Sequence, residues 1–315
     1  MRGFVNAIQS ILLLGVMGVI FALIGKLIAG LEGIAVAVIS CIVVILLSPR
    51  LSPAIVLQMY RARRLSPGET PGLYRIVERL ADSAHLSVVP ALYYIPSSIM
   101  NAFSLGRKDK TIIAVTDGLI RSLTGDEIAG IMAHEVSHIK NKDLWIMGLA
   151  DFISRFTNVF SFIGIFFLIL YFPAIFLGWI EFPLWTAAVI FFAPYASVLL
   201  QLALSRTREY EADADAVTLT GDPGALAAAL GKIDQYPLKI WDLIFLPGQR
   251  VPAPSILRTH PHTMKRIARL KDIAERTPGI RSETSGNPSD LNKSMQIPGS
   301  PVTRRPRRRI GGFWH

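Results

Sequence analysis

The sequence is poor in charge and nearly free of cysteine. Of its 315 residues, 51% are hydrophobic and only 18% are charged, and its mean hydropathy is +0.42. A soluble domain has roughly 25% charged residues, so this balance excludes an ordinary soluble chain and indicates a membrane protein. The single cysteine, Cys41, excludes an intrachain disulfide, and the sequence carries no mark of an oxidising compartment.

Two apolar runs open the chain. The first extends from Phe4 to Ile28 and the second from Ile34 to Leu47, with a glycine-containing turn between them. Because about 20 apolar residues cross a bilayer, residues 1–48 are predicted to form a hairpin of two transmembrane helices. The first run is longer than the apolar region of a signal peptide and has no small-x-small cleavage site, so we interpret it as a retained anchor.

A second pair of uncharged runs lies further along, from Val159 to Ile180 and from Phe182 to Leu204. These runs predict a second transmembrane hairpin within residues 145–204. Arginines follow the second run of the first hairpin, and Arg206 follows the second hairpin. By the positive-inside rule, the segments after each hairpin and the N-terminus face the cytoplasm.

The segment between the hairpins, residues 49–144, has the composition of a soluble domain. Pro71 opens a stretch with helical spacing, and the short aromatic segment Ala91–Ile95 is typical of a strand. Two further strand-like segments, 101–105 and 111–116, flank a polar loop and predict a hairpin. We therefore expect a small sheet beside the helix that follows.

That helix carries the pattern H-E-x-x-H. Thr124 and Glu127 form a capping-box signature at its start. His134 and His138 are four residues apart, so they share one helix face and can bind one metal ion. Glu135 projects roughly 100° away, where it can hold a water molecule. The pattern is short, and a solvated helix also contains such pairs, so a third ligand has to decide between the two interpretations.

The acidic helix after the fourth run, in residues 205–275, supplies candidates for that ligand. Glu209 is the candidate third ligand, and Asp213 lies one turn later on the same face, where it can orient a histidine. Spacing alone leaves Glu211 open as the ligand. An acidic solvated helix is the alternative interpretation for this segment taken by itself.

Together, the two motifs resemble those of the HtpX-type integral-membrane zinc metalloproteases, which are related to the CAAX prenyl proteases. The resemblance rests on H-E-x-x-H, on S-R-x-R-E-Y-x-A-D at 205–213, on N-A-F at 101–103 and on T-H-P at 259–261. It implies one Zn²⁺ per chain, bound by His134, His138 and Glu209, with Glu135 as catalytic base at the cytoplasmic face. It also implies a multi-pass protein of a bacterial or archaeal plasma membrane, and clearance of misfolded or damaged membrane proteins under stress.

The expected fold is a mainly α membrane protein: four transmembrane helices and a cytoplasmic zincin-like α+β metalloprotease domain with a small sheet. Two roles in this domain are less determined. His260, Tyr210 and Arg266 are candidates for stabilising the oxyanion or gating the site. An edge strand at Asn101, Ala102 and Phe103 can pair with an extended peptide substrate.

Other functions remain as alternatives. A catalytically silent scaffold with a structural zinc would normally show four protein ligands, and only three are apparent. A channel or transporter would need more ionisable residues in its spans. Among proteases, a prenyl-CAAX endopeptidase is the second candidate. The C-terminal residues 276–315 predict a disordered basic tail that favours anionic lipid headgroups over nucleic acid, since no folded nucleic-acid reader accompanies it.

Overall fold

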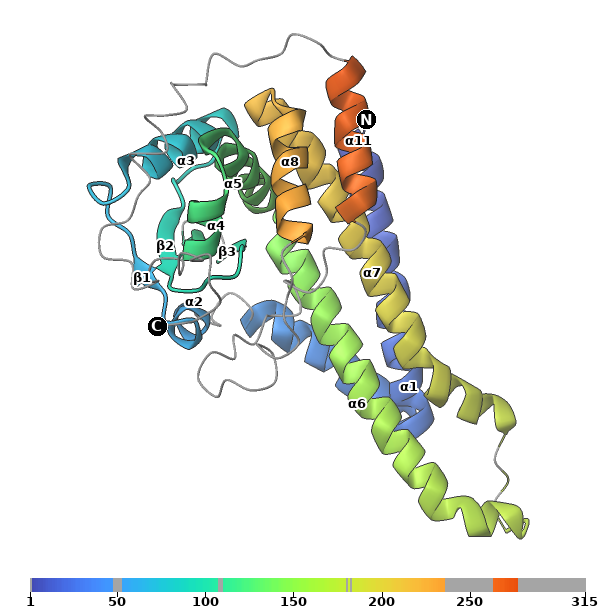
Figure 1. Ribbon diagram of the computed structural model, residues 1–315. Helices are drawn as coiled ribbons and strands as arrows, with labels where there is room; N and C mark the ends of the chain where they lie inside the picture. The colour runs from blue at the N-terminus through green and yellow to red at the C-terminus, as the bar shows by residue number, and fades with distance from the viewer. Residues whose placement is uncertain are drawn as a thin grey trace, which may run out of the picture.

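The computed structural model describes residues 2–47, 53–106, 110–179, 181, 183–235 and 263–276. Three long helices form a bundle, and a smaller sheet-containing part lies beside one end of it (Figure 1). The long helices are α1 (Arg2–Leu47), α6 (Asp143–Phe176) and α7 (Leu184–Thr220). The fold is thus mainly helical, as predicted. His260 and the basic tail beyond Arg276 lie outside the described residues.

Helix α1 folds back on itself as a hairpin of two helical arms. Its backbone leaves the helical region at Ala29 and Gly30, and Gly30 has a φ of 59°. A Cβ atom on Gly33 would lie 1.8 Å from the carbonyl oxygen of Gly25, so the two arms approach closely enough to require glycine. The predicted turn between the two N-terminal runs is therefore present.

Three helices in the described part of the chain are long and apolar enough to cross a membrane: Ile8–Leu27, α6 and α7. The second arm of α1 reaches Leu47, where the predicted apolar run ends, and contains a shorter apolar helix, Ala29–Val43. Four transmembrane helices thus stay a prediction for this chain.

The bundle has its own core and an apolar outer surface. Phe21, Met147 and Leu204 are buried where α1, α6 and α7 meet. Large apolar side chains also point outward: Phe162 on α6 is 73% exposed and Leu199 on α7 is 66% exposed. An apolar surface of this size is unusual for a soluble monomer and fits contact with lipid.

The sheet has four strands in the order β1-β2-β4-β3. Its strands are β1 (Arg63–Arg64), β2 (Ala91–Ile95), β3 (Ala102–Leu105) and β4 (Ile112–Thr116). Strands β2 and β4 are parallel, and β3 pairs with β4 antiparallel. The predicted small sheet and hairpin are confirmed, and β3 is an edge strand among the described residues.

The remaining helices among the described residues are shorter than those of the bundle, and α5 is the motif helix. They are α2 (Pro53–Met59), α3 (Pro71–Ser83), α4 (Asp117–Ser122), α5 (Gly125–Lys140), α8 (Pro223–Asp234) and α11 (Thr263–Arg276). Helix α5 contacts α3, α7, α8 and β3. At Gly130, a Cβ atom would lie 3.2 Å from the backbone of Leu226, so α5 and α8 pack at close range. The motif helix is therefore central and rigidly held.

The membrane helices continue directly into the sheet-containing part. A tight turn with Lys142 in the left-handed region, at a φ of 58°, joins α5 to α6. Helix α7 is one element from Leu184 to Thr220 and includes the second motif. The predicted divisions after residues 144 and 204 therefore fall inside helices and stay predictions of domain organisation.

Candidate metal centre

Helix α5 places the two motif histidines side by side. The capping box at its start is formed: Thr124 Oγ1 accepts from the Glu127 amide, and Glu127 Oε2 accepts from the Thr124 amide at 2.7 Å. One helical turn separates His134 from His138, and their Nε2 atoms lie 3.1 Å apart. Both side chains are largely buried. The motif thus lies on a well-capped helix, as predicted.

Helix α7 supplies the third donor. Glu209 Oε2 lies 3.4 Å from His134 Nε2, and Glu209 Oε1 lies 3.7 Å from His138 Nε2. With zinc–ligand bonds of about 2.0 to 2.1 Å, two corners of a tetrahedron lie about 3.3 Å apart. The three separations therefore suit one tetrahedral metal ion.

Glu211 has different partners. Its carboxylate accepts from Arg208 Nη1 at 3.0 Å. The described residues that cluster as possible metal ligands are His134, His138 and Glu209. The alternative that spacing left open is thereby resolved in favour of Glu209.

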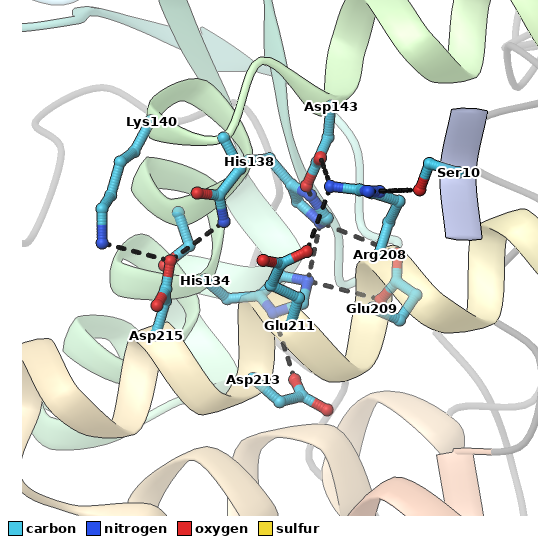
Figure 2. A network of polar contacts seen from close by, with 12 residues as sticks. Ser10, His134, His138, Lys140, Asp143, Arg208, Glu209, Glu211, Asp213 and Asp215 are labelled. Carbon is cyan, nitrogen blue, oxygen red and sulfur yellow. Dashed lines mark hydrogen bonds and ion pairs between the residues drawn. The ribbon is translucent and has the colours of Figure 1, made fainter. Parts of the chain in front are cut away.

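A carboxylate backs each histidine on the far side of its ring (Figure 2). His134 Nδ1 lies 3.1 Å from Asp213 Oδ1, and His138 Nδ1 lies 2.9 Å from Asp143 Oδ2. A proton held at Nδ1 leaves the Nε2 lone pair free for a metal ion. Both Nε2 atoms face each other and Glu209, an arrangement that a cation stabilises.

These carboxylates also shift the histidine pKa values in the metal-free protein. Burial alone would lower the pKa of His134, but hydrogen bonds with Asp213 and Glu209 outweigh it and raise that pKa to about 9. For His138, burial is again opposed by the hydrogen bond with Asp143, and the pKa is raised. Metal binding at neutral pH therefore has to displace protons.

Arg266 reaches the site from α11. Its Nη1 lies 2.7 Å from Glu209 Oε2, and its Nε and Nη2 bind both oxygens of Asp213 at 2.8 and 2.7 Å. Only 1% of its side chain is exposed. The guanidinium thus engages the carboxylates of the site, and the oxyanion role that we considered for it stays a prediction.

Tyr210, another oxyanion candidate, contacts α11. The Arg269 guanidinium lies over its ring, 5.2 Å from the centroid. The third candidate, His260, lies outside the described residues.

A pocket opens onto the metal-binding atoms. Its lining comes from strand β3, from α5 and from the neighbouring ends of α6 and α7, and includes Phe103, Glu135, His138, Met147 and Glu209. Within the part of the chain that the structure describes, no side chain forms a hydrogen bond or ion pair with the Glu135 carboxylate. That carboxylate is therefore available to a water molecule or substrate in the pocket.

Two residues of this site were missed by sequence reasoning. One is Asp143, which contacts His138 and lies just after the end of the motif helix. An acidic residue at this position was the signal that could have identified it. Arg208, which lies 3.3 Å from Asp143, is adjacent to Glu209 and belongs to the motif at 205–213, but the sequence assigned it no role at the site.

Two histidines one turn apart, a glutamate from a second helix and a free carboxylate beside an open pocket together define a metallopeptidase site. The chain belongs to peptidase family M48, whose model matches residues 67–274.

Among its relatives are proteins named protease HtpX homolog. The protein from Desulfatibacillum aliphaticivorans is 35% identical over 92% of this chain and 95% of its own length. The protein from Desulforapulum autotrophicum is 33% identical over 89% of this chain and 94% of its own. A crystal structure of S. mikatae Ste24p aligns with 85% of this chain and 66% of its own, with 21% identity and a TM-score of 0.47. The chain is a membrane metalloprotease of this family.

Proposed function

We propose that this chain is a zinc-dependent endopeptidase that cleaves misfolded or damaged membrane proteins at the cytoplasmic face of the membrane. The observation that carries the proposal is the Glu135 carboxylate, which has no side-chain partner among the described residues and lines the same pocket as His138 and Glu209. A structural metal site would be closed by a fourth protein ligand, whereas three ligands gather among the described residues and a pocket lies beside them. Catalysis, not scaffolding, is the function that this arrangement favours.

Zinc is the metal that the donor set favours. Two imidazoles and one carboxylate with near-tetrahedral separations are typical of catalytic zinc in peptidases. When bound there by His134, His138 and Glu209, one zinc ion per chain would polarise the scissile carbonyl and lower the pKa of a bound water towards about 7.

The residues of the chain then perform the proton transfers. Glu135 accepts the proton of the attacking water and delivers it to the leaving amine nitrogen. Asp213 and Asp143 keep the Nδ1 protons of His134 and His138 in place, so that both Nε2 lone pairs stay directed at the metal position. Burial of these groups limits competing water.

Strand β3 is a suitable binding surface for an extended peptide. Ala102 and Phe103 line the pocket, and β3 pairs with β4 on one side only within the described sheet. A substrate segment can therefore add to this edge as a further strand, with its scissile bond near Glu135. Asn101 pairs with Thr116 at the start of the strand and fixes its register.

Membrane proteins are the proposed substrates because apolar helices hold the site near the bilayer. Helix α7 carries both an apolar run and Glu209, and α6 begins at Asp143 beside His138. We propose that four spans, including the shorter second arm of α1, anchor the chain with both soluble segments in the cytoplasm. The basic tail would add contacts with anionic lipids.

The decisive experiment is a cleavage assay with protein purified in detergent. The wild-type protein is expected to cleave casein or an unfolded membrane protein, to stop on chelation and to recover with Zn²⁺. Glu135→Gln is expected to keep stoichiometric zinc and lose cleavage. Full activity in that variant would contradict the role of Glu135. Cleavage of a farnesylated CAAX peptide alone, without these proteins, would instead favour a prenyl-protein endopeptidase.

A further inference from the structure

The two histidines of the site are supported by two parallel chains of contacts. On one side, His134 contacts Asp213, and Asp213 is bound by Arg266. On the other side, His138 contacts Asp143, and Asp143 is bound by Arg208. Each chain thus runs from histidine to aspartate to a buried arginine. The sequence motifs indicated the first series of contacts, whereas the second series is seen only in the three-dimensional structure.

Arg208 is unusually enclosed for an arginine near a membrane surface. Its side chain is 6% exposed, and Asp143 is 1% exposed. Arg208 Nη1 lies 3.3 Å from Asp143 Oδ1 and 3.0 Å from Glu211 Oε2. An arginine that holds two carboxylates in a buried setting fixes their orientation, because its guanidinium is planar and its donors are in a rigid fork.

The far side of the same guanidinium contacts the first apolar helix (Figure 2). Arg208 Nε donates to Ser10 Oγ at 3.1 Å, and Nη2 also donates to this oxygen. Ser10 is 2% exposed and lies 198 positions before Arg208 in the chain. Helix α1 therefore contributes a polar contact to the support of the metal site, in addition to its apolar packing.

We propose that Arg208 is a positioning residue for the metal ligand His138, that it acts through Asp143, and that Ser10 of the first membrane helix holds it in place. This inference rests on the proposed zinc site. Asp143 has two oxygens with separate tasks: Oδ1 faces Arg208 and Oδ2 faces His138. Rotation of this carboxylate would break both contacts, so Arg208 fixes the direction in which His138 presents Nε2.

Charge reasoning supports the same role. Asp143, Glu211 and Glu209 are all largely buried close to one another. Removing the positive charge of Arg208 would leave the Asp143 and Glu211 carboxylates buried without this counter-charge, and the Asp143 carboxylate would lose the contact that fixes its orientation. An Asp143 carboxylate that can rotate no longer holds His138 Nδ1 in one direction, and the histidine becomes a less well oriented ligand.

A purely structural role for Arg208 is the competing explanation, since it also joins α1, α6 and α7. The two explanations differ in their effect on the metal itself. Loss of an outer carboxylate contact typically costs 10- to 100-fold in metal affinity. Loss of an interhelical clamp would lower thermal stability and leave the affinity of the folded fraction unchanged.

The test uses the full-length protein in detergent, with Zn²⁺ affinity measured by chelator competition and ligand geometry by the visible spectrum of Co²⁺. Arg208→Gln is expected to weaken Zn²⁺ binding about 10- to 100-fold and to alter the Co²⁺ bands. Arg208→Lys should retain part of the affinity, because lysine keeps the positive charge but lacks the planar, multidentate guanidinium. Ser10→Ala should weaken Zn²⁺ binding by a smaller factor. If Arg208→Gln does not fold, this second variant still tests the inference.

Two comparisons make the outcome decisive. Lys140→Ala is the matched control: Lys140 on α5 pairs with Asp215 on α7 at 3.2 Å, so it is also an interhelical ion pair of α7, but neither residue contacts a ligand. The double variant Arg208→Gln/Asp143→Asn should bind Zn²⁺ no worse than its weaker single variant, since both act through one contact. Losses that add, or wild-type affinity and Co²⁺ bands in both Arg208→Gln and Ser10→Ala, would overturn the inference. A wild-type protein without stoichiometric zinc would overturn the proposed function itself, and the inference with it.

Discussion

Arg266 Nη1 lies 2.7 Å from Glu209 Oε2, so a metal-binding carboxylate is shared with a buried guanidinium from a distant helix. Through this contact and its two bonds to Asp213, α11 is attached to the metal centre. Burial alone would lower the pKa of Arg266, but the hydrogen bond with Asp213 and the charge of Glu209 raise it, so the group stays charged. The C-terminal helix is thus part of the site.

Replacing Arg266 should therefore destabilise the protein and the site together. Arg266→Met leaves Asp213 and Glu209 without a buried counter-charge, and breaking one partner of such a pair costs about 3 to 5 kcal/mol. Denaturant unfolding of the metal-free protein measures this loss. Lys265→Ala, at the exposed neighbouring position on α11, is the control. Equal stability of the two variants would contradict this account of Arg266.

Replacing Glu209 should remove the metal without unfolding the chain. Glu209→Ala leaves two histidine ligands, which are too few for tight zinc binding. Elemental analysis of the purified variant is expected to show well under one zinc per chain. Asp215→Asn, two turns further along α7 and paired with Lys140, should retain full zinc content. Normal zinc content in Glu209→Ala would show that the third ligand has been misassigned.

The outer edge of β3, which has no neighbouring strand within the described sheet, should contribute to substrate affinity. Asn101 accepts from the Thr116 amide, and Phe103 pairs with Ala114 in the same register, so the intervening backbone groups of Ala102 and Ser104 point away from β4. Ser104→Pro would remove one outward donor and is tolerated on an edge strand. We expect kcat/KM to fall about three- to tenfold, which corresponds to one hydrogen bond of roughly 0.5 to 1.5 kcal/mol.

The control for this prediction is Ser104→Ala, which keeps the backbone N–H and removes only the hydroxyl. Zinc content should be normal in both variants. If Ser104→Ala lost as much activity as Ser104→Pro, the side chain and not the strand edge would be responsible.

The metal-free protein should show a pH dependence set by His134. Its pKa of about 9 in the folded state exceeds the ordinary value of 6.5. Its proton therefore stabilises the folded state fully below about pH 6.5, and this stabilisation is lost as the pH rises through about 9. Thermal unfolding of the metal-free protein between pH 6 and 9 should show a falling Tm.

Zinc binding should have the opposite dependence, because zinc displaces this proton. The apparent affinity is expected to fall about tenfold for each pH unit below about 9 for one displaced proton. Asp213→Asn removes a main cause of the raised His134 pKa. The zinc affinity of this variant should therefore begin to fall only at a lower pH than that of the wild-type protein. Chelator competition at several pH values measures the zinc affinity of the wild-type protein and of Asp213→Asn. The same pH dependence in both would contradict the assignment of the displaced proton to His134.

Local patterns in the sequence predicted the parts of the site that depend on local geometry. The capping box at Thr124 and the one-turn spacing of His134 and His138 are properties of a single helix, and both are present. Glu209 and Asp213 were predicted for the same reason, since residues four positions apart on one helix share a face.

The remaining parts depend on packing between distant segments. Ser10 and Arg208 are 198 positions apart, and no periodicity relates them. Asp143 contacts His138 only because the turn at Lys142 reverses the chain at that point. The apolar run from Ile34 to Leu47 predicted where the second arm of α1 ends, but its apolar helix, Ala29–Val43, is shorter than a full span, so its crossing of the membrane stays a prediction.

The unbroken course of α7 gives the enzyme a fixed height above the bilayer. Glu209 follows Leu204, the end of the predicted apolar run, by five positions, or about 7.5 Å of helix. On α6, the exposed Arg155 lies twelve positions beyond Asp143, or about 18 Å. A substrate that is itself anchored in the membrane must therefore extend about two to five residues from its own span before a peptide bond reaches the metal. With the proposed membrane-protein substrates, cleavage sites would be selected by their distance from the membrane.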